Sequence, residues 1–130
     1  EPSQQIRDVI KACRERGCRS IAIICKTDME AQAAFQLLKE DEEVTYINRH
    51  INYFPLGTVI LPVYLAKGLE FDAVIVYNAN QTVYTSEYDR SLLYTACTRA
   101  LHHLYIFYEG ELTPFLGAVA ADLYTLKTRP

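Results

Sequence analysis

Three runs of almost uninterrupted apolar residues limit most strongly the folds that this chain can adopt. They are 20–25 (SIAIIC), 73–77 (AVIVY) and 103–108 (HLYIFY), and all are short and rich in β-branched or aromatic side chains. A strand with one solvated face alternates polar and apolar residues, whereas an unbroken apolar run is typical of a strand covered on both faces. The sequence therefore predicts a parallel sheet buried between helices.

Helical patterns alternate with these runs. Apolar residues recur at helical spacing over 3–16 and 28–39, and further helices are expected over 86–100 and 114–124. Ser3 and Asp28 are candidate N-caps, and Gly17 is the candidate helix end. Further strands are expected near 44–47 and 58–62, with a loop over 48–57. This alternation implies right-handed β-α-β crossovers and a three-layer α/β/α sandwich. We expect one domain over 1–130, with a leading helix at 1–17 and a helical tail at 109–130.

Composition and charge exclude several classes of protein. The chain has 130 residues, of which 50% are hydrophobic and 22% charged, as in an ordinary globular domain, and its net charge is −3. That charge argues against a simple duplex-binding module but not against a motor that holds one strand in a shared groove. No apolar stretch is long enough to span a membrane, and no signal peptide is visible, so we expect a cytoplasmic protein. Because residue 1 is Glu rather than Met, we expect a piece of a longer protein or a processed chain.

The cysteines do not suggest a metal site. Cys13, Cys18, Cys25 and Cys97 form no CxxC pair, and the three histidines are not at ligand spacing from them. Structural zinc usually needs closely paired ligands, so no metal site is expected. Free thiols in a domain of this size suit a reducing compartment.

Two short motifs point to a function. Ala66–Asp72 (AKGLEFD) and Leu93–Ala100 (LYTACTRA) each come shortly before one of the apolar runs. Taken together and in this order, they resemble motifs V and VI of the UvrD/Rep-type superfamily 1 DNA helicases. The resemblance extends over about residues 20–108. It implies the C-terminal RecA-like motor lobe of such an enzyme, a P-loop NTPase-like fold without its own P-loop.

The resemblance also implies roles for individual residues. ATP and Mg²⁺ would be held mainly by a first RecA-like lobe of the same polypeptide, and this lobe would close on them. Arg99 matches the family's arginine finger by its position in the second motif. A guanidinium is permanently charged and therefore suits the charge that develops on a transferring phosphoryl group. Glu70 matches the acid that contacts the nucleotide sugar. The plainer alternatives are a surface arginine at a helix end and a solvent-exposed glutamate before a strand.

Neighbouring residues have less specific roles. Gly68 either lets the backbone approach a ligand or makes a turn, and Lys67 either pairs with phosphate or structures the loop. Tyr94 and Thr98 are expected to pack around Arg99 and orient it. Leu92, Ala96 and Leu101 are expected to belong to the core.

The chain departs from the family pattern in three places. Family members usually carry Thr-x-His before motif V, where this chain has Pro62 and Tyr64. Tyr64 would either stack on a base of single-stranded DNA or be buried. The arginine of the upstream "NYR" motif is absent, and only the loop 48–57 stands where an inserted subdomain is usual. The run YLAKGLEFD resembles the helicase IV (HelD-like) branch.

What the sequence lacks limits what the chain does alone. It has no GxxxxGK[ST] phosphate loop, and its acidic run 40–43 follows a predicted helix rather than a strand, as a solvated turn would. We therefore expect ATP-driven helicase or translocase activity only in the whole protein, and none in this chain alone. One alternative is an ATP-driven RNA polymerase-binding factor of the HelD type. Another is an independent α/β domain in which the motifs are coincidental.

Overall fold

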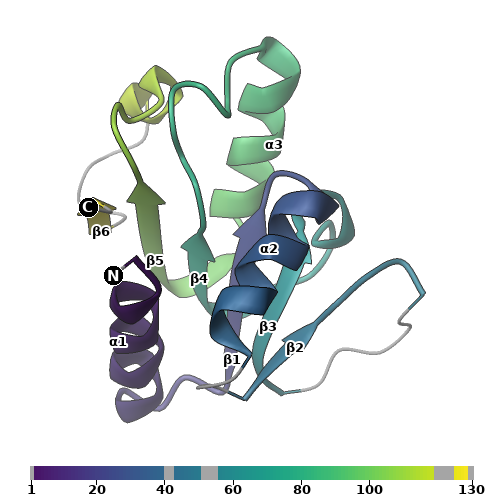
Figure 1. The fold of residues 1–130 in the computed structure, drawn as a ribbon, viewed down its shortest axis with the longest axis vertical. Coiled ribbons are helices and arrows are strands. Elements are labelled where there is room, and N and C mark those ends of the chain that lie inside the picture. Colours follow the sequence, from purple (N-terminus) through teal and green to yellow (C-terminus); the bar gives the residue numbers. More distant parts are fainter. Residues whose placement is uncertain (1, 40–42, 51–55, 119–124, 129–130) are drawn as a thin grey trace.

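Six strands form one sheet in which every neighbouring pair is parallel. The computed structural model describes residues 2–39, 43–50, 56–118 and 125–128. The strand order is β2-β3-β1-β4-β5-β6 (Figure 1). The strands are β1 (Ser20–Cys25), β2 (Val44–Tyr46), β3 (Gly57–Pro62), β4 (Phe71–Val76), β5 (Ala100–Tyr108) and β6 (Thr125–Thr128). The helices are α1 (Pro2–Glu15), α2 (Asp28–Leu38) and α3 (Glu87–Cys97), with 3₁₀ turns η1 (Val63–Leu65) and η2 (Pro114–Ala118).

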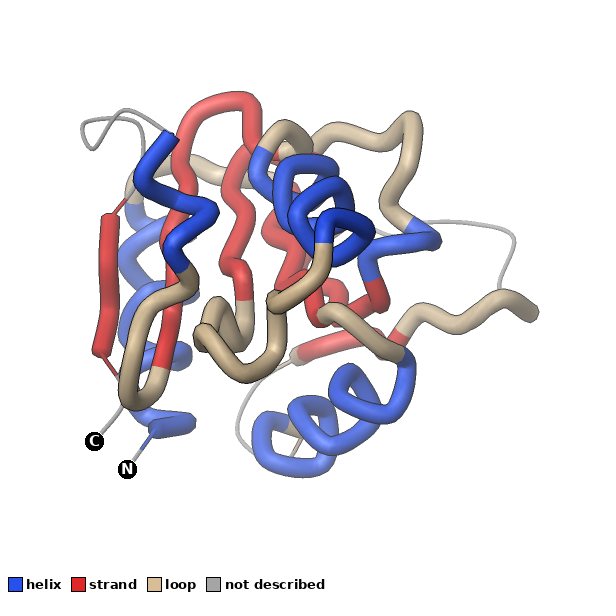
Figure 2. The backbone as a smooth tube through the Cα atoms, turned by 90° about the horizontal axis from the view of Figure 1, so that it is seen from above, coloured by secondary structure: helices blue, strands red, loops and turns tan. Residues whose placement is uncertain are grey.

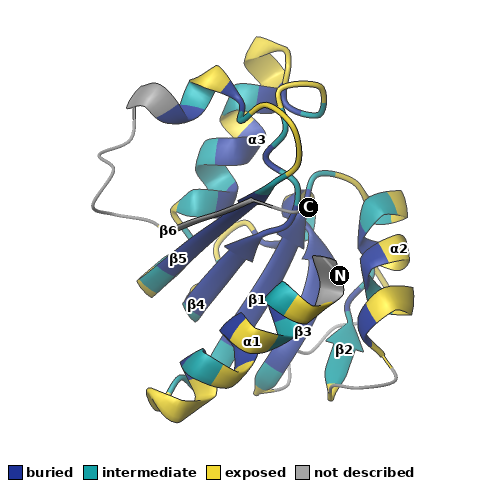
Figure 3. Ribbon diagram, turned by 60° about the vertical axis from the view of Figure 1, so that its left-hand side comes forward, coloured by how far each residue is buried: buried dark blue, intermediate teal, exposed yellow. Residues whose placement is uncertain are grey.

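Helices cover both faces of the sheet, so the predicted three-layer α/β/α sandwich is confirmed. Figure 2 shows helices on both sides of the strands. One core cluster joins the sheet to α1 and α2, and a second joins the opposite face to α3, η1 and η2. The central strands β1, β3 and β4 are buried almost throughout, while the outer faces of α1 and α2 are exposed (Figure 3). The unbroken apolar runs in the sequence reflect this burial on two faces.

The helix ends follow capping chemistry, with two corrections. Thr27 caps α2, because its side chain accepts from the Glu30 N–H at 3.1 Å; the predicted cap, Asp28, is the first helical residue instead. Ser3 does not cap α1, because that helix already begins at Pro2. The predicted end at Gly17 is confirmed: φ there is +89°, and Cys18 N–H donates to Cys13 C=O at 3.0 Å, as in a Schellman motif.

The C-terminal part of the chain differs from the prediction. Helix α3 ends at Cys97 rather than near residue 100, and β5 begins at Ala100 rather than at residue 103. The expected helical tail over 109–130 contains the 3₁₀ turn η2 and the strand β6, which pairs in parallel with β5. Residues 119–124 of the predicted helix, 51–55 of the predicted loop and 40–42 of the acidic run lie outside the described residues.

The strand order places a topological switch beside β1. From β1 the chain proceeds to β2 and β3 on one side, and then to β4, β5 and β6 on the other. In open α/β sheets, ligands bind in the crevice at the carboxyl ends of the strands flanking such a switch. Within the described ranges, no helix has the length and apolar character needed to cross a membrane.

Candidate functional site

The connection from β3 to β4 divides the predicted site residues between the two edges of the sheet. Both strands run parallel to β1, so the segment 63–70 must return from the carboxyl edge to the amino edge. Tyr64 lies in η1, directly after β3, at the carboxyl edge. Glu70 directly precedes β4, at the amino edge. Tyr64, the predicted nucleic-acid contact, and Glu70, the predicted nucleotide contact, therefore lie at opposite edges of the sheet.

Arg99 joins the two motifs at the amino edge. It follows Thr98, the C-cap of α3, and precedes Ala100, which pairs with Phe71 at the start of β4. Its backbone C=O accepts from the Phe71 N–H at 2.9 Å. The structure thus brings Arg99 beside the loop that carries Glu70, although the two residues are far apart in sequence.

The guanidinium of Arg99 is held by neutral oxygen atoms. Nε donates to Thr95 C=O at 3.1 Å, Nη1 to Leu69 C=O at 3.3 Å and Nη2 to Thr98 Oγ1 at 3.2 Å. Arg99 is half-buried, and within the described residues it makes no ion pair with a carboxylate. These three hydrogen bonds fix the position of the side chain. Because an arginine keeps its proton and the three acceptors are neutral, the positive charge remains available to an anion.

The loop before β4 is open to solvent. Lys67, Gly68 and Glu70 are exposed, whereas Ala66 is buried and Leu69 packs partly against the core. Gly68 has φ +80°, and a Cβ added there would meet no atom within 4 Å. The conformation of the turn, rather than crowding within this chain, therefore favours glycine.

The two predicted supporting residues, Tyr94 and Thr98, make different contacts. Thr98 Oγ1 donates to Tyr94 C=O at 2.9 Å and accepts from Arg99, so Thr98 contacts the guanidinium directly. The Tyr94 hydroxyl donates to Phe115 C=O at 3.4 Å, and Arg90 lies 5.5 Å from the centre of the Tyr94 ring. The Tyr94 side chain thus connects α3 to η2.

The predicted core residues of the second motif are mostly confirmed. Leu92 and Ala96 are buried in the α3 face of the core. Leu101 is 51% exposed, so its assignment to the core is wrong. It lies among the first four residues of β5, none of which is buried.

A hollow lies at the carboxyl edge, beside Tyr64. Its volume is about 250 Å³, and it is lined by Lys26, Thr27, Asp28, Val63, Tyr64, Tyr88 and Leu92. Tyr64 is 47% exposed, so of its two predicted alternatives, burial is wrong. Stacking on a base stays a prediction.

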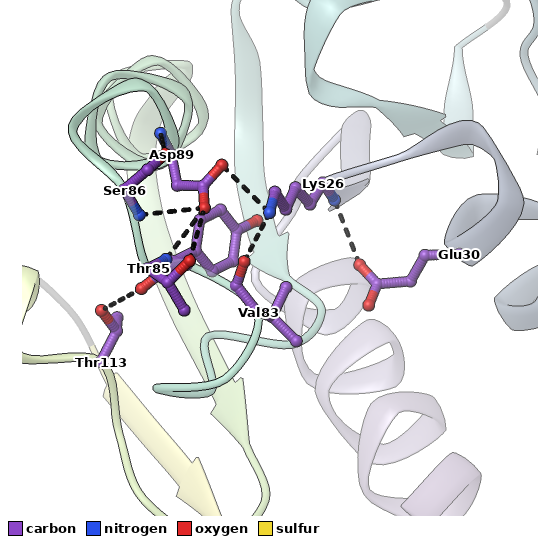
Figure 4. Close-up of polar contacts among 8 residues, drawn as sticks. Lys26, Glu30, Val83, Thr85, Ser86, Asp89 and Thr113 are labelled. Atoms are coloured by element: carbon purple, nitrogen blue, oxygen red, sulfur yellow. Dashed lines mark hydrogen bonds and ion pairs between the residues drawn. The ribbon is translucent and has the colours of Figure 1, made fainter.

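A polar cluster at the switch between β1 and β4 was not anticipated from the sequence. Lys26 Nζ lies 3.0 Å from Asp89 Oδ1 and donates to Val83 C=O at 2.6 Å (Figure 4). Glu30 accepts from the Lys26 N–H at 3.1 Å and from Asn78 Nδ2 at 3.0 Å. The cluster thus lies at the carboxyl edge of the sheet, the edge at which many α/β sheets bind ligands.

The carboxylate of Asp89 is the centre of this cluster. Burial raises the pKa of Asp89, but hydrogen bonds from the Thr85 and Ser86 N–H groups and from Lys26 outweigh burial and hold this pKa below its ordinary value. The N–H of Asp89 in turn donates to Ser86 Oγ at 3.1 Å, which completes a capping box. The Ser-x-x-Asp spacing was the one signal for Asp89 in the sequence, and nothing comparable identified Lys26 as its partner.

The cysteines are free thiols in the structure. Burial raises the pKa of Cys97 to about 12, and burial is also the main cause of a raised pKa at Cys13. Among the described residues, no group of three histidine, cysteine or acidic side chains is arranged to hold a metal ion.

Comparisons with known proteins agree with the motifs. The family of UvrD-like helicase C-terminal domains matches residues 57–107, which include both motifs. The chain is also similar to a solved structure described as the C-terminal domain of a possible DNA helicase from Lactobacillus plantarum WCFS1. The two are 43% identical, with a TM-score of 0.83, over 96% of this chain and 77% of that one. No curated protein matches the chain significantly. Because the likeness extends over nearly the whole chain and far beyond the motifs, this protein belongs to the UvrD-like helicase C-terminal domain family.

Proposed function

We propose that this chain is the second motor lobe of an ATP-dependent DNA helicase or translocase, and that it supplies Arg99 to ATP bound on a first RecA-like lobe. The observation that carries the proposal is the guanidinium of Arg99, which is half-buried at the amino edge of the sheet and, among the described residues, is held by neutral acceptors only. The exposed loop bearing Glu70 lies beside it.

The residues around Arg99 fit a bound triphosphate. Thr95 and Leu69 hold the guanidinium through their carbonyl oxygens, so its direction is set without neutralising its charge. A planar, permanently charged fork of donors suits the charge that develops on a transferring phosphoryl group. ATP provides the phosphoryl-transfer chemistry when bound, and the first lobe would hold Mg²⁺ and most of the phosphate contacts.

Three further residues would contact the nucleotide from the same loop. The exposed carboxylate of Glu70 would accept hydrogen bonds from the ribose hydroxyls. Lys67 would face the phosphates, and the open turn at Gly68 would let the backbone approach the ligand. Closure of the two lobes would then depend on bound ATP, because ATP would contact both lobes only in the closed arrangement and would therefore bind that arrangement more tightly.

Single-stranded DNA is the proposed track of this motor. It would run across the carboxyl edge, where the ring of Tyr64 is exposed. The alternative of an RNA polymerase-binding factor of the HelD type has no support in either comparison, and neither comparison identifies the HelD-like branch.

The test is DNA-stimulated ATP hydrolysis by the protein in which this chain is joined to its first lobe. Arg99→Ala should lower turnover at least about 100-fold, since arginine fingers contribute on the order of 10³–10⁵. Nucleotide affinity, measured alongside, should stay within a few-fold. Arg99→Lys keeps the charge but not the fork of donors, and should recover only part of the turnover.

Arg90→Ala is the matched control, because Arg90 lies on the same helix but contacts Glu87, Tyr94 and Phe115 instead. It should leave turnover close to that of the unmodified protein. If Arg99→Ala folds and hydrolyses ATP at an unchanged rate, the assignment of Arg99 is wrong.

A further inference from the structure

Two of the four cysteines lie together where α1 ends. The helix ends in a Schellman motif around Gly17, in which the Cys18 N–H donates to the Cys13 C=O at 3.0 Å. This motif brings the side chains of the two hydrogen-bonded residues together, often in an apolar contact. In this chain both residues are cysteines, so the end of the helix places two free thiols side by side.

The backbone geometry allows these two thiols to form a disulfide. One carbonyl group, the 3.0 Å hydrogen bond and one N–Cα bond connect the Cα atoms of Cys13 and Cys18. Together they keep the two Cα atoms within about 6.9 Å of each other, and a disulfide is out of reach only beyond about 7 Å. The side chains also meet, because the Cys13 thiol donates a hydrogen bond to Cys18 Sγ. A bridge is therefore within the reach of the folded chain.

The surroundings of the two thiols differ. Cys13 is fully buried, whereas Cys18 is partly exposed, so an oxidant in solvent meets Cys18 first. Arg16 Nη1 donates to the Tyr105 hydroxyl at 2.6 Å, and that hydroxyl donates to Cys13 Sγ. Burial and the neighbouring Cys18 raise the pKa of Cys13, whereas the Tyr105 hydroxyl and the Arg16 charge favour its thiolate. Cys18 is thus placed to react first and Cys13 to react with it.

We propose that Cys13 and Cys18 form a peroxide-sensitive pair that closes to a disulfide in the folded domain. The Cys18 thiolate attacks one oxygen of hydrogen peroxide, the O–O bond breaks, and Cys18 becomes a sulfenic acid. The hydroxide that leaves takes up the proton that Cys18 had released and becomes water. Cys13 then attacks the Cys18 sulfur, the S–O bond breaks, and a second water leaves with the Cys13 proton as the S–S bond forms. Two thiols are oxidised by two electrons in all, and one peroxide is reduced to two waters.

Tyr105 and Arg16 would assist the second step as positioning residues. Cys13 loses its proton as it attacks, and the Tyr105 hydroxyl, polarised by Arg16, donates to the charge that forms on the Cys13 sulfur. Cys25 and Cys97 have no such relation to each other, because they pack on opposite faces of the sheet. The bridge should therefore be specific to one pair.

The proposal goes beyond the proposed function, since it requires neither ATP nor DNA. The bond would join the end of α1 to the segment that leads into β1. The next two residues of that segment, Arg19 and Ser20, donate their N–H groups to Asp72 at 2.7 and 3.3 Å. A bridge would thus brace the amino edge of the sheet from the side of α1.

The first experiment treats the reduced chain with a few equivalents of hydrogen peroxide. The remaining thiols are alkylated after unfolding, and the products are mapped by mass spectrometry. We expect one disulfide, between the tryptic peptides 12–14 and 17–19, with Cys25 and Cys97 alkylated. Dithiothreitol should restore all four thiols. The oxidised chain should melt at a higher temperature than the reduced chain, because the bridge restricts the unfolded chain.

Two variants separate the steps of the reaction. Cys13→Ala should stop at the sulfenic acid of Cys18, which dimedone captures. Cys18→Ala leaves only the buried thiol of the pair, and oxidation at Cys13 should slow at least about 10-fold. The expected map for the unmodified chain does not depend on the folding of either variant.

A tyrosine pair tests the positioning role. Tyr105→Phe should slow disulfide formation several-fold, but in the Cys13→Ala background it should leave capture of Cys18 by dimedone unchanged. Tyr77→Phe is the matched control, because Tyr77 belongs to the same core cluster and is 6% exposed, against 7% for Tyr105. It should leave both rates unchanged, and equal disulfide rates in the two Phe variants would refute the role of Tyr105.

Three results would overturn the pair. They are peroxide treatment that leaves Cys13 and Cys18 unlinked, disulfides that form between other cysteines as often as between these two, and an oxidised chain that melts at a lower temperature than the reduced chain. The last result would mean that the fold does not accommodate the bridge. None of these measurements uses ATP, DNA or the first lobe, so the cysteine pair and the role of Arg99 can fail independently.

Discussion

At the scale of single residues, the pairing of Lys26 with Asp89 joins two charged side chains at the carboxyl edge of the sheet. Asp89 is 6% exposed, and it accepts hydrogen bonds from the Thr85 and Ser86 N–H groups as well as from Lys26. A buried charge is tolerated only when it is paired and hydrogen-bonded. The cluster therefore fixes the end of β1 against the start of α3.

The lowered pKa of Asp89 predicts an acid-sensitive contribution to stability. A carboxyl group whose pKa is lower in the folded chain than in the unfolded chain stabilises the fold above its unfolded pKa, near 4, and loses this effect as the pH falls toward the folded value. Asp89→Asn should therefore lower the free energy of unfolding at pH 7 by about 1–3 kcal/mol. It should also make that free energy less dependent on pH below about 4. Urea unfolding at several pH values between 7 and 3 measures both effects.

Asp8→Asn is the control for this prediction. Asp8 is exposed on α1 and accepts only from the neighbouring Gln4 side chain among the described hydrogen bonds. That variant should unfold like the unmodified chain. A pH profile for Asp89→Asn parallel to that of the unmodified chain would contradict the role given to Asp89.

Sequence analysis identified Arg99 and Glu70 but not this pair, and the reason is physical. The motif residues lie in contiguous stretches whose order along the chain carries the signal. Lys26 meets Asp89 only because β1 and β4 are neighbours in the sheet while their helices lie on opposite faces. Strand order is a property of the tertiary fold, and no local pattern encodes it.

At the scale of elements, α3 depends on the chemistry of its first turn. Ser86 Oγ accepts from the Asp89 N–H at 3.1 Å, and the Asp89 carboxylate accepts from the Ser86 N–H at 3.1 Å. Each bond satisfies a donor that the start of a helix would otherwise leave unpaired. Since Arg99 directly follows Thr98, the C-cap of α3, the box stabilises the helix that positions the proposed ATP contact.

Loss of the capping serine should destabilise the domain measurably. Ser86→Ala is expected to lower the free energy of unfolding by about 1 kcal/mol, because the Asp89 N–H loses its acceptor. Ser91→Ala, in the exposed middle of the same helix, should be neutral or slightly stabilising, since alanine is the better helix former. Thermal unfolding of the two variants side by side gives the measurement. Equal melting temperatures for them would exclude a stabilising cap.

Elements with strong local signals were predicted, and those that depend on partners were not. The apolar runs predicted β1, β4 and β5, and helical spacing predicted α1, α2 and α3 to within a few residues. The strand β6 (TLKT) has no apolar run, and it is a strand only because it pairs with β5 at the edge of the sheet. The first residues of β5 were missed for a similar reason, since the exposed Leu101 and His102 interrupt the buried pattern.

At the scale of the whole molecule, the fold separates the two proposed sites by the length of the sheet. The sequence places Tyr64 and Glu70 only six positions apart. The return of segment 63–70 from the carboxyl edge to the amino edge places them on opposite edges. A lobe built in this way can touch a track at one edge and a nucleotide at the other.

The same arrangement predicts that this chain alone neither hydrolyses ATP nor binds it tightly. At the amino edge it offers Arg99, Glu70 and Lys67, but no Gly-rich loop whose N–H groups could surround the phosphates. The stabilisation that a ligand gives a folded chain grows with the logarithm of its concentration relative to its dissociation constant, so a weakly bound ligand stabilises little. Millimolar Mg-ATP should therefore shift the melting temperature of the chain by less than about 1 °C, and phosphate release should equal that of buffer.

The protein with both lobes is the positive control, because there the first lobe would provide the phosphate loop and Mg-ATP should raise the melting temperature. Arg99→Ala in that protein should keep most of this stabilisation while losing turnover, since a finger acts on the transition state more than on the bound ground state. Hydrolysis by the isolated chain that Arg99→Ala abolishes would contradict the division of labour proposed here. It would mean that the amino edge of this single lobe holds and cleaves the nucleotide by itself.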